Sequence, residues 1–293
     1  LQAIGNLEVR GALVTGGLDA NTTALFRVGN GITATAGSVT LSAGSFVVPV
    51  GIRASDDIRL SAVTTMNTGD LSAGDSLFLT APGSIITGNI DAGTVNPAPL
   101  ASGVLFATST DFISTGAINV AGSATLSGEL GVFTGDITAP GGIALLDTGG
   151  IETGALTTSD TGFIYIASHL SLPQIGFDTA GNPLFADLLA SAPTRLIGDI
   201  TVFGPVSTSQ FVAAATGNVS VSGLVNAGRT SLSSGGDVTL TGSFVGSDDL
   251  IVVADGNGTF DNITAAGEVS ISTGLVLQLA AVEAGDRISL VAG

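Results

Sequence analysis

One short phrase recurs about every 19 residues along the chain, and this repeat constrains the fold more strongly than any other feature. In the phrase a glycine and an aspartate or asparagine precede an aliphatic residue, as in Gly135-Asp136-Ile137. A step of this length predicts one ladder of about 14 aliphatic residues. Its predicted members are Leu13, Ile32, Ile52, Leu71, Ile90, Ile118, Ile137, Leu156, Ile175, Ile200, Val219, Val238, Ile263 and Val282. Such a period indicates a solenoid in which each repeat forms one coil.

Short alternating runs lie between the turn residues of each repeat. Val219 and Val221 alternate with polar residues, as in a half-buried strand, and glycine, asparagine and aspartate suit the corners between strands. A second apolar position is predicted about six residues after the ladder, at Ile58, Leu77, Ala124, Ile143, Val206, Val225, Val269 and Ile288. A third is predicted about seven residues further on, at Phe26, Val104, Leu188, Leu232, Ile251 and Val276.

Three strands per repeat predict an all-β fold, a right-handed parallel β-helix (β-solenoid) that is three-sided, with about 19 residues per coil. We expect residues 1–293 to form a single β-solenoid segment, an excerpt of a longer repeat protein. Aliphatic side chains should stack along the inside of the coils. We expect large aromatic side chains not to fit there, in keeping with the absence of tryptophan.

Three steps of the ladder are longer than the others, those that follow Ile90, Ile175 and Val238. The extra residues are predicted at 107–116, 189–199 and 252–262, with 96–102 and 176–189 as competing positions for the first two. In the first arrangement all three insertions leave the rod at one corner and share one side, as on a binding face. The competing explanation is that corners simply tolerate extra residues.

The charge of the chain excludes several classes of partner. The net charge is −17 and all seven basic residues are arginine, so the surface should repel nucleic-acid phosphates and anionic membranes. Cysteine is absent, which excludes disulfides and thiolate metal sites. No apolar run approaches the ~18 residues of a spanning helix, so we expect no transmembrane segment.

The repeated phrases resemble the filamentous haemagglutinin repeats of large bacterial exoproteins. The likeness covers nearly the whole chain and is carried by "GDITAPGG", "GNVSVSG", "GDVTLTGS" and "DNITAAGEVSISTG". The resemblance implies a right-handed β-helix stalk, secretion by the two-partner or autotransporter route to the extracellular space or the bacterial cell surface, and adhesion or fibre formation. It supplies no catalytic residues.

Candidate catalytic groups are few. His169 is the single histidine and lies beside no nucleophile motif, so we interpret it as a solvated or loop residue. Two acidic pairs, Asp56-Asp57 and Asp248-Asp249, could serve acid–base chemistry of the kind used on polysaccharides. Each pair follows a serine and precedes a strand, which favours a turn. We therefore predict no catalytic residues and no enzyme activity.

One stretch has oxygen ligands at alternate positions, as Ca²⁺ loops do: Asp255, Asn257, Thr259 and Asp261. The sixth loop position is Phe260 rather than glycine, and the twelfth is Ala266 rather than glutamate. We favour a plain corner insertion, so no cofactor is expected. Asp255, Asn257 and Asp261 remain the candidate Ca²⁺ ligands.

The sequence therefore favours a structural or adhesive rod without catalysis, in a fibre, stalk or adhesin. The alternative is a polysaccharide-binding or polysaccharide-cleaving β-helix, which the scarcity of aromatic and basic residues disfavours. Expected partners are a host or neighbouring cell surface, glycans, or further copies of the chain. Because open coil ends leave strand edges unpaired, end-to-end association would give an open filament.

Overall fold

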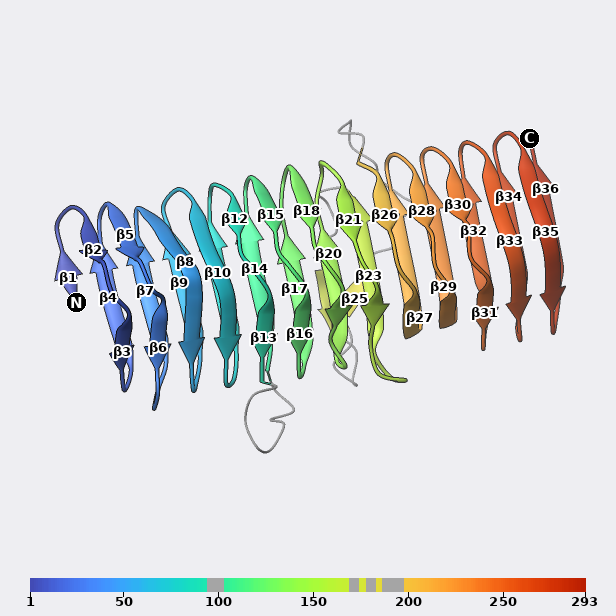
Figure 1. Ribbon diagram of the computed structural model, residues 1–293. Helices are drawn as coiled ribbons and strands as arrows, with labels where there is room; N and C mark the ends of the chain where they lie inside the picture. Colours follow the sequence, from blue (N-terminus) through green and yellow to red (C-terminus); the bar gives the residue numbers. More distant parts are fainter. Residues whose placement is uncertain (94–102, 169–173, 178–182, 186–197) are drawn as a thin grey trace.

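The chain forms one rod of stacked coils with its two termini at opposite ends (Figure 1). The computed structural model describes residues 1–93, 103–168, 174–177, 183–185 and 198–293, with side chains described outside 174–177 and 183–185. All regular structure in this part of the chain is β-strand, and 34 strands belong to one continuous sheet. The sheet winds through about 13 turns of about 19 residues, which confirms the predicted parallel β-solenoid.

Each coil contributes strands to three faces, here named A, B and C. Face A holds β3 (Leu13–Thr15), β6 (Ile32–Ala34), β13 (Ile90–Ala92), β16 (Ile118–Val120), β19 (Ile137–Thr138), β22 (Leu156–Thr157) and β31 (Phe244–Gly246). Face B holds β1 (Gln2–Ala3), β4 (Leu18–Thr22), β7 (Val39–Ala43), β9 (Ile58–Ala62), β11 (Leu77–Ala81), β14 (Leu105–Ser109), β17 (Ser123–Ser127), β20 (Gly142–Leu146), β23 (Phe163–Ser168), β32 (Leu250–Ala254), β34 (Val269–Thr273) and β36 (Ile288–Ala292).

Face C and the shared strands complete the coils. Face C holds β2 (Leu7–Val9), β5 (Leu25–Val28), β12 (Ile85–Ile86), β15 (Phe112–Ser114), β18 (Gly131–Phe133), β21 (Ile151–Thr153), β26 (Ile200–Val202), β28 (Val219–Val221) and β30 (Val238–Leu240). Four long strands run from face C into face A: β8 (Ser45–Ala54), β10 (Met66–Ala73), β33 (Gly258–Ala265) and β35 (Leu277–Ala284). Two run from face A into face B: β27 (Val206–Ala215) and β29 (Val225–Ser234).

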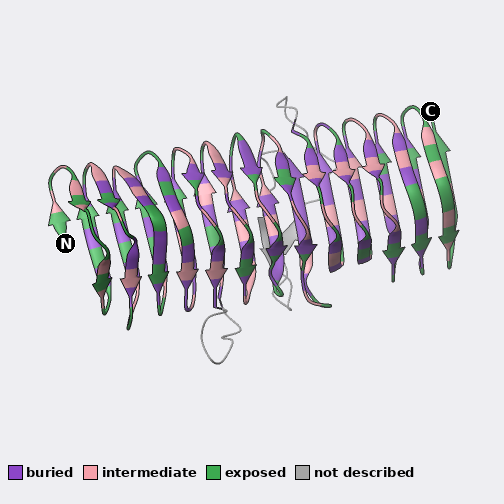
Figure 2. Cartoon of the chain, viewed as in Figure 1, coloured by how far each residue is buried: buried purple, intermediate pink, exposed green. Residues whose placement is uncertain are grey.

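Identical positions of successive coils pair in parallel, which produces columns of side chains inside the rod. On face A, twelve pairings link thirteen residues: Leu13, Ile32, Ile52, Leu71, Ile90, Ile118, Ile137, Leu156, Val206, Val225, Phe244, Ile263 and Val282. Buried and exposed residues alternate along the strands (Figure 2), as period-two side chains on a half-buried sheet require. In this column, apolar side chains of successive coils pack on one another.

The predicted ladder was wrong at four of its members, of which three lie on another face and one lies in a separate sheet. Ile200, Val219 and Val238 lie on face C, one below another, and do not continue the column of Leu156. Ile175 lies in β24 (Gln174–Phe177), which pairs antiparallel with β25 (Pro183–Phe185) in a separate sheet. Ile263 and Val282 return to the column on face A.

The second predicted position corresponds to face B at Ile58, Leu77, Ala124, Ile143, Val269 and Ile288. Val206 and Val225, placed in the same set, belong to face A instead. Of the third set, Phe26 lies in the column of face C, whereas Leu232 is inward on face B. Ile251 points outward on face B, and Val104 and Val276 stand just before strands. Leu188 lies outside the described residues. The third column was therefore predicted wrongly.

Large aromatic side chains do fit inside the rod, contrary to the prediction. The core includes the fully buried side chains of Phe26, Phe46, Phe211, Phe244 and Phe260. Phe26 and Phe46 stack on face C with ring centroids 5.8 Å apart in an edge-to-face contact. Phe244 and Phe260 each have a glycine two residues away, Gly246 and Gly258. A Cβ at Gly246 would lie 2.6 Å from the Phe244 ring, so the missing side chain makes room for the ring.

The long steps of the ladder have two different causes. Pairing jumps by 28 residues between Leu77 and Leu105, so the first insertion precedes Leu105 at the A–B corner. Residues 107–116 form β14, β15 and the turn between them, so their assignment as an insertion was wrong; the competing stretch 96–102 lies outside the described residues. The second insertion lies between Ser168 on face B and Ile200 on face C. Residues 189–197 of the predicted stretch 189–199 fall outside the description, as do residues 178–182 and 186–189 of the competing stretch 176–189.

The third predicted insertion does not exist. Residues 252–262 run from β32 into β33, and Phe244 pairs with Ile263 at the ordinary step of the coil. The two real insertions leave the rod at different corners, A–B and B–C. They therefore do not share one side, and the predicted common binding face is wrong.

Side-chain hydrogen bonds of aspartate and asparagine connect several corners to the equivalent corner of the next coil, and we call such a series a corner ladder. Asp70 Oδ1 accepts from the backbone N–H of Asn89 at 2.8 Å, and Asn89 Oδ1 accepts from that of Ala117 at 2.9 Å. The same arrangement precedes face C, where Asn218 Oδ1 accepts from Asp237 N–H at 2.8 Å. Each such bond satisfies a corner N–H that no strand partner reaches. The recurring Gly-Asp or Gly-Asn phrase of the sequence therefore forms these corners.

Candidate functional site

The first acidic pair, Asp56-Asp57, lies at the A–B corner and is close to a third carboxylate. Asp57 forms an ion pair with Arg59 at 2.8 Å and accepts from Ser76 N–H at 3.1 Å. Asp75, one coil further on, brings its carboxylate within 4.8 Å of those of Asp56 and Asp57. Asp75 was missed, although it follows Asp56 at the repeat distance. The hydrogen bonds to the next coil support the turn interpretation of this pair.

The second acidic pair occupies the equivalent corner near the other end. Asp249 Oδ1 accepts from Glu268 N–H at 2.8 Å, so it fastens the corner as predicted for a turn residue. Asp248 is exposed. The two carboxylates therefore have different surroundings. Asp248 lines a surface hollow, described below.

The candidate Ca²⁺ ligands stand at a corner and on the strand after it. Asn257 Nδ2 donates to Asp237 Oδ1 at 3.1 Å, and its own Oδ1 accepts from Val276 N–H at 3.3 Å. Asp255 is exposed in the bend before it, and Asp261 is exposed on β33. The side-chain amide of Asn257 thus already forms hydrogen bonds with the coils on either side. His169 lies outside the described residues.

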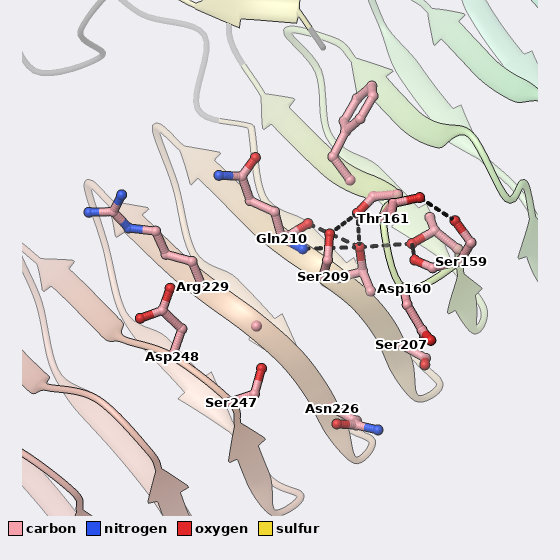
Figure 3. A pocket seen from close by; sticks show the side chains of 15 residues that line it. Ser159, Asp160, Thr161, Ser207, Ser209, Gln210, Asn226, Arg229, Ser247 and Asp248 are labelled. Carbon is pink, nitrogen blue, oxygen red and sulfur yellow. Dashed lines mark hydrogen bonds between the residues drawn. The ribbon is translucent and has the colours of Figure 1, made fainter. Parts of the chain in front are cut away.

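A hollow of about 640 Å³ opens at the A–B corner, where the corner length changes between coils. From Leu156 to Ile164 the chain takes eight positions, two more than from Ile137 to Ile143 in the preceding coil. In the next two coils β27 and β29 pass straight through the same corner without a turn. A protruding corner therefore stands beside two flattened ones, and the hollow lies between them (Figure 3).

Buried hydroxyls hold the protruding corner in place. Thr158 Oγ1 donates to Thr208 Oγ1 at 2.8 Å, at inward positions where neighbouring coils have Ala139 and Ala227. Gly162 O accepts from Thr208 Oγ1 at 3.1 Å and from Ser209 Oγ at 2.5 Å. Because these bonds tie the corner to the following coil, the hollow is formed before any ligand arrives.

The lining of the hollow is mainly polar. It is made by Thr158, Ser159, Asp160, Thr161, Gly162, Phe163, Ser207, Thr208, Ser209, Gln210, Asn226, Gly228, Arg229, Ser247 and Asp248. Gln210, Arg229 and Asp248 are exposed, and none of their side chains forms a hydrogen bond or ion pair with another described residue. Figure 3 shows Arg229 beside Asp248 of the next coil. Hydrogen-bonding groups of both kinds are thus left free around one space.

Sequence reasoning missed this hollow, since of its lining residues only Asp248 belongs to a motif, the second acidic pair. The available signal was the length of the corner "TTSDTG", which exceeds that of its neighbours. Compared with known proteins, the chain matches no family model, no curated protein and no solved structure. No helix within the described ranges is long and apolar enough to cross a membrane.

Proposed function

We propose that the chain is a rigid rod segment of a structural or adhesive protein at a cell surface or in the extracellular space. The observation that carries this proposal is the unbroken column on face A, whose parallel pairings continue past both insertions. A function that depends on reach and stiffness needs this continuity, whereas an enzyme needs one local site.

The physics of the coil supports a mechanical role. Each coil is tied to the next by three strand ladders and by the corner bonds of aspartate and asparagine. In a repeat architecture stability is the sum of coil and interface terms, so a long stack resists bending and local opening. Backbone bonds aligned along the rod act together when the rod is pulled.

The resemblance to filamentous haemagglutinin repeats supports the same proposal. That family places β-helical stalks at the surface of bacteria, where they adhere or form fibres. A net charge of −17 disfavours side-by-side aggregation of the rods. The absence of cysteine means that stacking alone must stabilise the rod.

End-to-end association is part of the proposal. The end coil of any β-solenoid has strand edges whose backbone groups are unpaired, and these can pair with a further coil. That coil can come from the same chain or from another copy. Sedimentation at increasing protein concentration separates the two, because only the second makes length depend on concentration.

The rod itself is tested by pulling single molecules of the full chain between two handles. We expect high-force unfolding in steps whose contour lengths are multiples of a coil of about 19 residues. Smooth extension at low force would contradict a load-bearing role. Electron micrographs of the native material should show straight rods of uniform width.

A further inference from the structure

We propose that the hollow at the A–B corner binds a short, uncharged oligosaccharide. This deepens the proposed adhesive function by naming a ligand class for one place on the rod. The rod proposal does not depend on it, since a stalk can be stiff with an empty hollow. The argument rests on size, on chemistry and on charge.

The size suits an oligosaccharide. The hollow is lined by residues from four successive coils, with Thr158, Thr208, Asn226 and Ser247 as one from each. Three coil spacings of ~4.8 Å give a length of about 14 Å along the rod. A volume of about 640 Å³ lies within the range of small-ligand sites. A single ion would leave most of this space unfilled.

The chemistry suits a polyol. Sugar hydroxyls both donate and accept, so they pair best with a mixed set of side chains rather than with one kind. Asp160 and Asp248 can only accept, Arg229 can only donate, and Gln210 can do both. These groups have no protein partner within the described chain, so binding a sugar costs no internal bond. Half-buried Phe163 adds an aromatic surface to the lining.

The charge favours an uncharged sugar. Arg229 supplies one positive charge to the lining, and Asp160 and Asp248 supply two negative charges. The remainder of the chain is acidic as well, with a net charge of −17. A sulfated or sialylated glycan would meet this field at close range, whereas a neutral sugar would not. The same field argues against a phosphate ligand.

The test is a binding measurement on the full chain by saturation-transfer NMR and calorimetry. The probes are cellotetraose, maltotetraose, galactotetraose and chitotetraose, with sialyllactose and a sulfated disaccharide as charged comparisons. We expect at least one neutral tetrasaccharide to bind. Arg229→Ala and Asp248→Asn should each weaken that binding at least tenfold. Arg53→Ala removes an exposed arginine on face A that does not line the hollow; it is the matched control and should leave the sugar binding unchanged.

Thermal melting of each variant shows whether the rod still folds, which is expected because the substituted residues are exposed. The proposal is overturned if none of the neutral sugars binds, if only the charged sugars bind, or if both hollow variants bind as well as the parent. None of these results affects the pulling experiment, so failure of the hollow and failure of the rod are distinguishable.

Discussion

Thr158 Oγ1 donates a 2.8 Å hydrogen bond to Thr208 Oγ1, a residue 50 positions further along the chain. The two threonines are neighbours because the second insertion leaves and re-enters the rod without disturbing face A. Both occupy inward positions that hold alanine in the coils on either side, Ala139 and Ala227. The bond is thus a local departure from the aliphatic column, and it lies directly beneath the hollow.

Replacing Thr208 by alanine should destabilise this corner. The change removes a buried hydroxyl that accepts from Thr158 and donates to Gly162 O, a loss of about 1–3 kcal/mol. Because coils open locally, the effect should appear as faster amide hydrogen exchange around Gly162 as well as a lower urea midpoint. Thr157→Ala, on the exposed side of β22, is the control and should change neither. Equal exchange in both variants would contradict the role of the bond.

Replacing Gly246 by alanine should overpack the core beside Phe244. The new Cβ would lie 2.6 Å from the Phe244 ring, which costs about 1–3 kcal/mol of stability. Combining it with Phe244→Ile recreates the pair Ile263 and Ala265 of the next coil. We expect the double variant to recover most of the urea midpoint that Gly246→Ala loses. If the single variant is as stable as the parent, the size compensation is refuted.

Tyr165 should resist ionisation in the folded rod. Burial raises the pKa of its phenol above the ordinary value of 10.0. Since the folded pKa exceeds the unfolded one, the stability gained by keeping the phenol neutral is complete below pH 10 and falls as the pH rises above it. Tyr165 is the single tyrosine, so tyrosinate absorbance reports it alone. Native protein should ionise at higher pH than protein in urea; coincident curves would contradict the burial.

The corner ladder can be tested at Asp237. Its Oδ1 accepts from the backbone N–H of Asn257 at 2.6 Å and from Asn257 Nδ2 at 3.1 Å. Asp237→Ala leaves a corner N–H without a partner and should cost about 1–3 kcal/mol. Asp237→Asn keeps an acceptor oxygen and should lose less than half as much, as measured by urea denaturation. Equal losses would mean that charge, not the hydrogen bond, fastens the corner.

These corners explain what could be predicted from the sequence. The period and the strand type follow from local pattern, since an aspartate or asparagine, in most coils after a glycine, marks the corners that bond to the next coil. The same phrase, however, precedes face A at Asp136 and face C at Asp199, because both corners need an acceptor for the next coil's N–H. The phrase therefore identifies a corner without saying which one, and the ladder changed face after Leu156.

The core and the hollow were harder to predict for a related reason. Phe244 fits because Gly246 lies beside it, and such compensation depends on spatial neighbours rather than on one position. The hollow depends on a long corner beside two coils that lack a turn, Val206–Ala215 and Val225–Ser234. Corner length could be counted only once the face of each strand was known. Both features thus depend on the pairing register of the coils, which the sequence pattern alone does not define.

A final prediction concerns the threonines that replace valine on face C. Thr68, Thr87, Thr115, Thr134 and Thr153 occupy one inward column. Thr153 Oγ1 accepts from Thr134 Oγ1 at 2.9 Å, whereas the buried Oγ1 of Thr68 has no hydrogen-bond partner among the described residues. A buried hydroxyl without a partner costs about 1–3 kcal/mol, and valine has nearly the same shape.

The two ends of this column should therefore respond in opposite directions to the same substitution. Thr68→Val removes a polar group without a hydrogen-bond partner next to Val48. It should raise the free energy of unfolding by about 1 kcal/mol, and with it the urea midpoint. Thr153→Val breaks the bond from Thr134 and should lower the midpoint by a similar amount. Because both variants make the identical chemical change at buried sites of one face, differences in hydrophobicity cancel between them. A loss of stability in Thr68→Val would contradict the cost assigned to its unpaired hydroxyl.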